Sequence, residues 1–258
     1  MLLTDCISCS TSVLAALDRQ LIAEMLAIDP NALVDISNLK GVVFAGVETH
    51  PYLVPGAAKA LKDAIATRGR TMTINSAYRT IAQQMLLYSN QKSCGIVAAA
   101  PGRSNHQGGA AIDIEDPDGW KLALGLCGWR KLGAWDNMHF DYPGSDIRAL
   151  SVKAFQSLCN KNGLSMVIDG DLGDSTLGQL AKAPIEGFAI ALTPRTMCLT
   201  SPIQQGKDVG KLQLALGIKA DGVFGPGTDT AVRTWQSSQT LAADGRVGDT
   251  SRGKLQLA

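Results

Sequence analysis

The chain has 258 residues, of which 45% are hydrophobic, so it can build a core and is long enough for more than one small domain. Its formal net charge is only +1 and it carries no basic tail, which argues against a nucleic-acid-binding protein. No apolar run approaches the ~20 residues that a membrane span needs, so we expect no membrane-spanning segment. Residues 1–10 contain Asp5 and lack the basic and apolar regions of a secretory signal.

The first half of the chain alternates predicted helices and strands. Residues 13–28 place apolar side chains at helical spacing, and Pro30 ends this helix. Pro55 begins a second helix over residues 56–67. The later elements are, in chain order, a strand at 71–76, a helix at 80–90, a loop at 94–109, a strand at 110–114, a helix at 118–127 capped by Asp118, and a strand at 138–142. Because no regular βαβ rhythm is present, we predict the α+β class, with a small antiparallel sheet and flanking helices.

After Pro143 the chain becomes helical and repetitive. The motif Asp-Gly-x-x-Gly occurs three times, at residues 169–173, 221–225 and 244–248. The Asp-Gly pair is typical of a tight turn, and a Thr or Ser after each copy can cap a following helix. Similar helical stretches precede two copies, at 152–156 and 232–236. The pattern predicts repeated helix–turn–helix units, with a proline-containing connection at 184–202.

Six cysteines leave the disulfide pattern open, because six allow fifteen pairings. They are Cys6, Cys9, Cys94, Cys127, Cys159 and Cys198. Cys6 and Cys9 form a C-x-x-C, but no second C-x-x-C completes a zinc motif, so a disulfide or free thiols are favoured there over a metal. Our preferred hypothesis pairs Cys94 with Cys127.

Two of the three histidines lie in informative surroundings. His106 belongs to SNHQGGAAID, residues 104–113, which ends at Asp113 in a predicted strand. His139 belongs to WDNMHFDY, residues 135–142. Two imidazoles and one carboxylate suit zinc, and three protein ligands leave a fourth position open for water. The pattern therefore predicts one catalytic zinc ion held by His106, Asp113 and His139.

Hydrolysis at such a site also needs a proton carrier and a group that faces developing charge. Asp136, three residues before His139, is the candidate general base and acid. Arg79, which follows the strand at 71–76, is the candidate for holding a carboxylate or an oxyanion. Each of these residues taken alone is more often structural, and His50 is expected to be so. The glycines at 102–109 fit no phosphate-binding pattern.

Together these segments resemble the zinc D-Ala-D-Ala carboxypeptidases, the vancomycin-resistance D,D-peptidases and the L-alanyl-D-glutamate endolysins of phages. The family pattern runs Ser-x-Tyr-Arg, a Gln, Ser-x-His-x-x-Gly-x-Ala-x-Asp, and an acid-x-x-His. It occurs here as SAYR at 76–79, Gln84, SNHQGGAAID at 104–113 and DNMH at 136–139. The resemblance covers about residues 45–143. It implies the same metal ligands, a catalytic Asp136, an Arg79 that faces the peptide, and Tyr78, Gln84 and Ser104 lining the substrate groove. Many relatives carry Glu at the position of Asp136.

The end of the chain, from about residue 205, resembles the common peptidoglycan-binding module, a small three-helix bundle. Residues 147–187 resemble only part of that module. We therefore expect four segments, which are an N-terminal helical extension (1–45), a zinc peptidase domain (46–143), a partial peptidoglycan-binding-like helical segment with a linker (144–200) and a peptidoglycan-binding domain (201–258).

The resemblance implies a monomeric zinc peptidase that binds peptidoglycan and cuts its stem peptides, either by removing a terminal D-Ala or at an internal bond. It also implies that the protein acts outside the cytoplasm, in the wall or periplasm. Export would use a signal peptide absent from this sequence or another route such as phage lysis. The alternative is a non-catalytic peptidoglycan-binding protein whose zinc site is structural or vestigial.

Overall fold

The computed structural model describes residues 1–133, 136–188, 196–201, 203–204, 206–255 and 257. The chain divides into two compact units, residues 1–190 and 191–258. The predicted segments at 1–45, 46–143 and most of 144–200 lie in the first unit. Part of the predicted connection, including residues 189–195 and Pro202, lies outside the described residues. No helix in the described ranges has the length and apolar character needed to cross a membrane.

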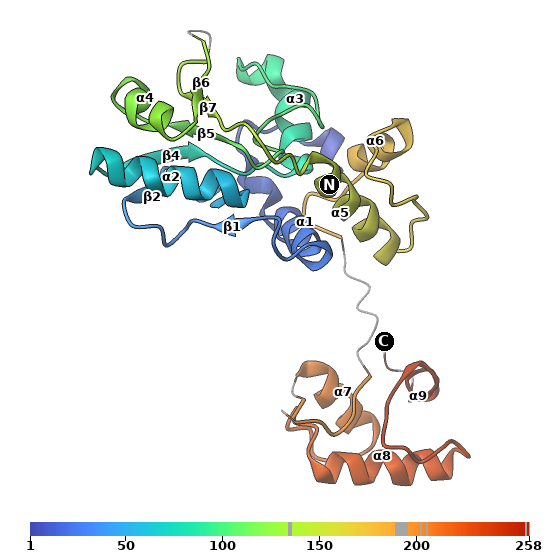
Figure 1. Ribbon diagram of the computed structural model, residues 1–258. Coiled ribbons are helices and arrows are strands. Elements are labelled where there is room, and N and C mark those ends of the chain that lie inside the picture. The colour runs from blue at the N-terminus through green and yellow to red at the C-terminus, as the bar shows by residue number, and fades with distance from the viewer. Residues whose placement is uncertain (134–135, 189–195, 202, 205, 256, 258) are drawn as a thin grey trace. The chain divides into compact units, whose positions relative to one another are not determined.

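A mixed five-stranded sheet forms the centre of the first unit (Figure 1). Its strands, in order across the sheet, are β2 (Val42–Phe44), β4 (Met72–Ser76), β5 (Ala111–Ile114), β7 (His139–Asp141) and β6 (Arg130–Lys131). β2 and β4 run parallel, and the other neighbours are antiparallel. A separate two-stranded sheet pairs β1 (Val34–Asp35) with β3 (Tyr52–Leu53). The predicted α+β class with small sheets is confirmed. The parallel pair of the large sheet lies at its edge, where β2 pairs with β4.

Two helices cover one face of the large sheet, and they are α2 (Pro55–Arg68) and α4 (Pro117–Leu126). Their apolar side chains share one core with Ile112, Ile114 and Phe140 of β5 and β7. Side chains of a strand alternate between the two faces of its sheet. The intervening residues, including Asp113 and His139, therefore project from the opposite face.

A second core joins the N-terminal segment to the helices that flank the sheet. Its helices are α1 (Ala15–Ile28), α3 (Ile81–Cys94), α5 (Arg148–Lys161) and α6 (Asp174–Ala181), with short 3-10 turns η1 (Leu3–Asp5) and η2 (Thr11–Leu14). Leu14, Leu17 and Leu21 pack there against Val152 and Phe155 of α5. The α5–α6 segment is therefore an integral part of the first unit.

The second unit contains α7 (Lys207–Ala215), α8 (Pro226–Ser238) and α9 (Asp249–Leu255). Val209, Phe224, Val232 and Val247 belong to its small core. A β-bridge between Met197 and Val247 ties the start of this unit to the segment before α9. The predicted helical C-terminal bundle is confirmed.

The three Asp-Gly turns share one hydrogen-bonding device. A buried glutamine on the preceding helix donates to the Asp side chain and accepts from the Gly N–H. The glutamines are Gln156 for Asp169–Gly170, Gln213 for Asp221–Gly222 and Gln236 for Asp244–Gly245, with all six N···O distances between 2.8 and 2.9 Å. The glycines have φ between +71° and +80°, where side chains are strained. The predicted repeat therefore consists of three turns clamped in the same way, one in the first unit and two in the second.

Two local expectations are corrected. Helix α4 is capped by Asp116, whose side chain accepts from the Gly119 N–H, and Asp118 lies inside the first turn because Pro117 takes the first helical position. The disulfide joins Cys9 to Cys94, with Cα atoms 5.5 Å apart, and Cys127 is a free thiol. The reason is that η1 and η2 pack on α3, which brings Cys9 to the end of that helix.

Candidate metal centre

Three polar side chains lie in register on the face of the large sheet that α2 and α4 leave uncovered. Ser76 of β4 pairs with Asp113 of β5, and Asp113 pairs with His139 of β7. Directly paired residues of antiparallel strands hold their side chains about 5 Å apart. The sheet itself therefore brings together two of the predicted metal ligands, which are 26 residues apart along the chain.

The third predicted ligand, His106, comes from the loop between α3 and β5. Its backbone carbonyl accepts from the N–H groups of Arg79 and Gly109 at 3.2 and 3.1 Å. Gly109 has φ +72°, and an added Cβ there would lie 2.9 Å from Val54 Cγ1. The glycine of the SNHQGG motif is thus needed for the loop to pack closely enough to deliver His106.

The ligand atoms of His106, Asp113 and His139 converge, and all lie within 4.8 Å of one another. His106 Nε2 lies 3.2 Å from His139 Nδ1 and 3.2 Å from Asp113 Oδ2. His139 Nδ1 lies 2.9 Å from Asp113 Oδ1. Ligands at 2.0–2.1 Å in a tetrahedral zinc site are about 3.3 Å apart. The spacing of the two imidazole nitrogens and the two Asp113 oxygens is therefore close to what one small cation requires.

Partners on the far side of each ring fix the tautomers. His106 Nδ1 lies 2.8 Å from the carbonyl oxygen of Ala77, which can only accept, so Nδ1 carries the proton and Nε2 keeps its lone pair. His139 Nε2 lies 2.7 Å from Asp141 Oδ1, so Nε2–H donates and Nδ1 faces the centre. Asn105 Nδ2 donates to the same Asp141 oxygen at 2.8 Å. Such outer partners orient metal-binding histidines.

The charge state of the cluster follows from burial and from these contacts. Burial lowers the pKa of His106, so its imidazole is neutral near pH 7. Burial opposes ionisation of Asp113, but its polar contacts within the cluster outweigh burial and hold the pKa of Asp113 far below its usual range. Burial also disfavours a charged His139, yet its bonds to Asp113 and Asp141 raise the pKa of His139 to about 9. A cation that binds here therefore displaces a proton.

Arg79 lies beside the cluster in a fixed orientation. Its guanidinium donates to Gln84 Oε1 and to Ser76 Oγ, both at 3.1 Å, and lies 3.9 Å from Asp113 Oδ2. Burial lowers the pKa of Arg79, and the carboxylates of Asp113 and Asp136 act in the opposite direction. The Asp136 carboxylate thus lies near enough to Arg79 to influence its pKa. Trp135, the first residue of the WDNMHFDY motif, lies outside the described residues.

Two residues expected to line the substrate groove, Tyr78 and Gln84, are buried and hydrogen-bonded to other parts of the protein. Tyr78 is 2% exposed, and its hydroxyl donates to Met25 Sδ at 2.8 Å. Gln84 is fully buried, accepts from Arg79 and donates to the Ala99 carbonyl at 2.6 Å. Tyr78 thus packs in the core, although it also lines the cavity beside Arg79, and Gln84 holds Arg79. Contact of either residue with substrate stays a prediction. Ser104 is also buried.

His50 lies 3.0 Å from the buried Asp18, in keeping with a structural role.

The sequence patterns missed three residues around the cluster. Asp141 and Asn105 orient His139, and Gln107 anchors the loop by donating to Ser151 Oγ of α5 at 2.7 Å. The available signal was their position, because each lies within two residues of a predicted ligand.

Two cavities are lined by residues that contact the ligands, such as Ser76 and Asp141, although none of the three ligands lines either cavity. One of about 220 Å³ is lined by Ser76, Arg79 and Glu48. The other, of about 390 Å³, is lined by Asn105, Asp141 and Arg130. Among the residues that the structure describes, no fourth His, Cys, Asp or Glu joins the cluster. The arrangement can therefore hold a cation, and the partly exposed Asp113 carboxylate lies beside the guanidinium of Arg79.

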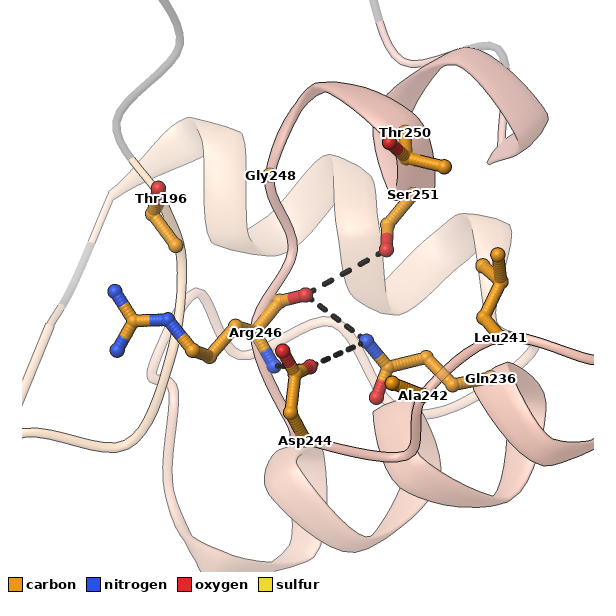
Figure 2. Close-up of a pocket in the computed structure, with 9 residues that line it drawn as sticks. All are labelled: Thr196, Gln236, Leu241, Ala242, Asp244, Arg246, Gly248, Thr250 and Ser251. Carbon is orange, nitrogen blue, oxygen red and sulfur yellow. Dashed lines mark hydrogen bonds between the residues drawn. The ribbon is translucent and has the colours of Figure 1, made fainter.

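The second unit has a cavity of its own, of about 360 Å³. Figure 2 shows it at the third clamped turn, where Gln236 donates to Asp244 and to the carbonyl of Arg246. The hydroxyl of Ser251 points to the same carbonyl. Polar groups thus line a pocket at the end of the repeat.

Comparisons with known proteins agree with both resemblances. Residues 52–139 match the family model of D-alanyl-D-alanine carboxypeptidase, and residues 205–255 match that of a peptidoglycan binding domain. A solved structure of the LdcB LD-carboxypeptidase aligns with 54% of this chain and 76% of its own, at 20% identity and a TM-score of 0.36. No curated protein matches the chain. The predicted combination of a peptidoglycan peptidase domain with a peptidoglycan-binding domain is confirmed.

Proposed function

We propose that this protein is a zinc-dependent peptidase that hydrolyses the stem peptides of peptidoglycan. The observation that carries the proposal is the convergence of His106 Nε2, His139 Nδ1 and the Asp113 carboxylate. The other nitrogen of each imidazole is hydrogen-bonded to the protein. A donor set of two imidazoles and one carboxylate suits zinc, and three protein ligands are typical of catalytic sites.

Zinc held by these residues supplies Lewis-acid chemistry, which activates water and polarises a carbonyl. The chain supplies the proton transfer and the orientation. Asp136 takes a proton from the attacking water and passes it to the leaving amine. Arg79, fixed by Gln84 and Ser76, holds a carboxylate of the peptide or the oxygen that becomes negative. The cavities lined by Arg79 and by Asp141 are the proposed places for the peptide.

The position of the cleaved bond separates two forms of this activity. A carboxypeptidase receives the free carboxylate of a terminal D-Ala at Arg79, whereas an endopeptidase accepts peptide through an open groove. Mass spectrometry of products from purified peptidoglycan distinguishes a loss of single D-Ala residues from internal cuts.

The second unit is proposed to hold the enzyme, as a monomer, on the wall. Support comes from its match to a peptidoglycan binding domain and from the polar cavity at its third turn. Activity on peptidoglycan requires a location outside the cytoplasm, in the wall or periplasm. The Cys9–Cys94 disulfide agrees with such an oxidising compartment.

Two substitutions test the peptidase. His106→Ala removes a ligand and Asp136→Asn removes the proton carrier while keeping its shape, so both should abolish muropeptide hydrolysis. Only His106→Ala should also lower the zinc content. Asp63→Asn, at an exposed carboxylate of α2, is the matched control and should leave both unchanged. Full hydrolysis by both folded variants would refute the proposal.

The competing function is a peptidoglycan-binding protein without catalysis, in which the metal is structural. The fixed Arg79 beside the cluster and the nearby Asp136 favour the enzyme, because a structural metal site needs neither group. Zinc analysis combined with a wall-digestion assay separates the two, since a pure binding protein pulls down peptidoglycan and releases no fragments.

A further inference from the structure

A second groove lies in the first unit, away from the metal ligands. It has a volume of about 450 Å³ and lies between the loop at Gly102–Arg103 and the clamped turn at Gly170–Asp171. It shares Asp146 and Arg148 with the cavity that Asp141 lines. The two cavities therefore have a wall in common, formed by Asp146 and Arg148, and Asp141, the partner of His139, lines the other cavity.

The walls of this groove are tied to the metal centre. Gln107, the neighbour of His106, accepts from the Gly102 N–H at 2.8 Å and donates to Ser151 Oγ of α5 at 2.7 Å. Gly102 also packs closely on the α5–α6 segment, since an added Cβ would lie 2.9 Å from Leu172 Cδ2. The loop that carries His106 is thus held to α5 by a buried hydrogen bond and to the clamped turn by packing.

The charges that face the groove are of two kinds. Arg148 is neutralised by Asp146, which accepts from its Nε at 2.8 Å. Arg103 and Asp171 are exposed, and within the described ranges neither side chain has a hydrogen-bond or ion-pair partner, nor do they pair with each other. The groove therefore offers one available guanidinium and one available carboxylate to a ligand.

The corresponding turn position lines a cavity in the second unit as well. Asp171 follows the clamped Asp169 by two residues, as Arg246 follows Asp244, and Arg246 lines the cavity at the third turn (Figure 2). The same repeat thus presents a charged side chain to a cavity in both units, once in the peptidoglycan binding domain and once beside the metal centre.

We propose that this groove binds a part of the peptidoglycan stem peptide that lies away from the cleaved bond. Arg103 takes a carboxylate of the peptide and Asp171 takes an ammonium group. The inference rests on the proposed function and extends it, because it gives the catalytic unit its own recognition of the wall polymer.

Binding at the groove is tested with the zinc-loaded full chain and a disaccharide–pentapeptide. Asp136→Asn is present in all samples to prevent turnover. The amide signals of Gly102 and Gly170 should shift on titration with this muropeptide, and not with the disaccharide alone. Arg103→Ala should raise the dissociation constant measured at these glycines about fivefold, which is the upper end of the range for the loss of an exposed charge pair. Arg70→Ala, at an exposed arginine outside the groove, should leave it unchanged.

A muropeptide whose side-chain carboxylates are amidated should bind Arg103→Ala and the parent equally. Unshifted glycines, or an equal affinity of Arg103→Ala and the parent for the unmodified muropeptide, would overturn the proposal. If the chain with Asp136 intact hydrolyses no muropeptide while the shifts persist, the peptidase function fails and the groove stands.

Discussion

Asp141 is predicted to control how tightly the centre binds zinc, although it is not a ligand. Its Oδ1 accepts from the buried His139 Nε2–H at 2.7 Å and from Asn105 Nδ2 at 2.8 Å. Asp141→Ala leaves that ring N–H without its partner and lets the imidazole rotate. Loss of such an outer partner lowers metal affinity about 10- to 100-fold. This range corresponds to about 1.4–2.8 kcal/mol.

Asp141→Asn gives an intermediate case. The amide oxygen still accepts from His139 Nε2–H, but the negative charge that makes the ring more basic is lost, so we expect about a tenfold weaker affinity. Competition between the protein and a chromophoric zinc chelator at constant pH measures both variants. Asp63→Asn is the control carboxylate. An affinity of Asp141→Ala within about twofold of the parent would refute the role of this hydrogen bond.

Three further predictions concern stability and reactivity. Cys9→Ser should lower the free energy of unfolding by about 2–4 kcal/mol, because the bond to Cys94 links positions 85 residues apart; a urea midpoint equal to that of the parent would contradict this. Gln156→Ala should speed hydrogen exchange at the first clamped turn, and Gln213→Ala only at the second, each costing about 2–3 kcal/mol of local stability; equal protection would show that the clamp is dispensable. Cys159 should resist iodoacetamide at pH 8 until the chain is unfolded, because burial raises the pKa of its thiol to about 12; rapid alkylation of the native protein would contradict its buried environment.

Periodicity and motif spacing were sufficient for the main elements and for the ligand set. The apolar spacing of residues 13–28 corresponds to η2 and α1, and the apolar run at 110–114 corresponds to β5. The three residues of the candidate metal centre were predictable as a group because each lies in a short motif in which donor atoms and glycines have fixed spacing. The alternation of side chains predicts that Asp113 and His139 lie on faces opposite to their apolar neighbours, while the register that pairs them comes from the structure.

Contacts between distant segments were not predictable from local patterns. The disulfide depends on how the N-terminal turns pack on α3, and nothing local to Cys9 or Cys94 records this packing. Asn105 and Asp141 are 36 residues apart and meet only when the loop folds over the sheet. β1, β3 and β6 have two residues each, too few for any periodicity to be visible. Tyr78 matched the family motif, yet its side chain packs in the core with Ile22 and Met25, residues that are distant in the sequence.

X-ray absorption spectroscopy of the zinc-loaded protein tests most directly whether three distant side chains share one cation. We predict one zinc per chain, with only nitrogen and oxygen neighbours at about 2.0–2.2 Å, two of them imidazoles. The imidazole contribution should fall in His139→Ala. Sulfur neighbours at about 2.3 Å would show that cysteines bind the metal instead. A spectrum unchanged in His139→Ala would also contradict the proposed centre.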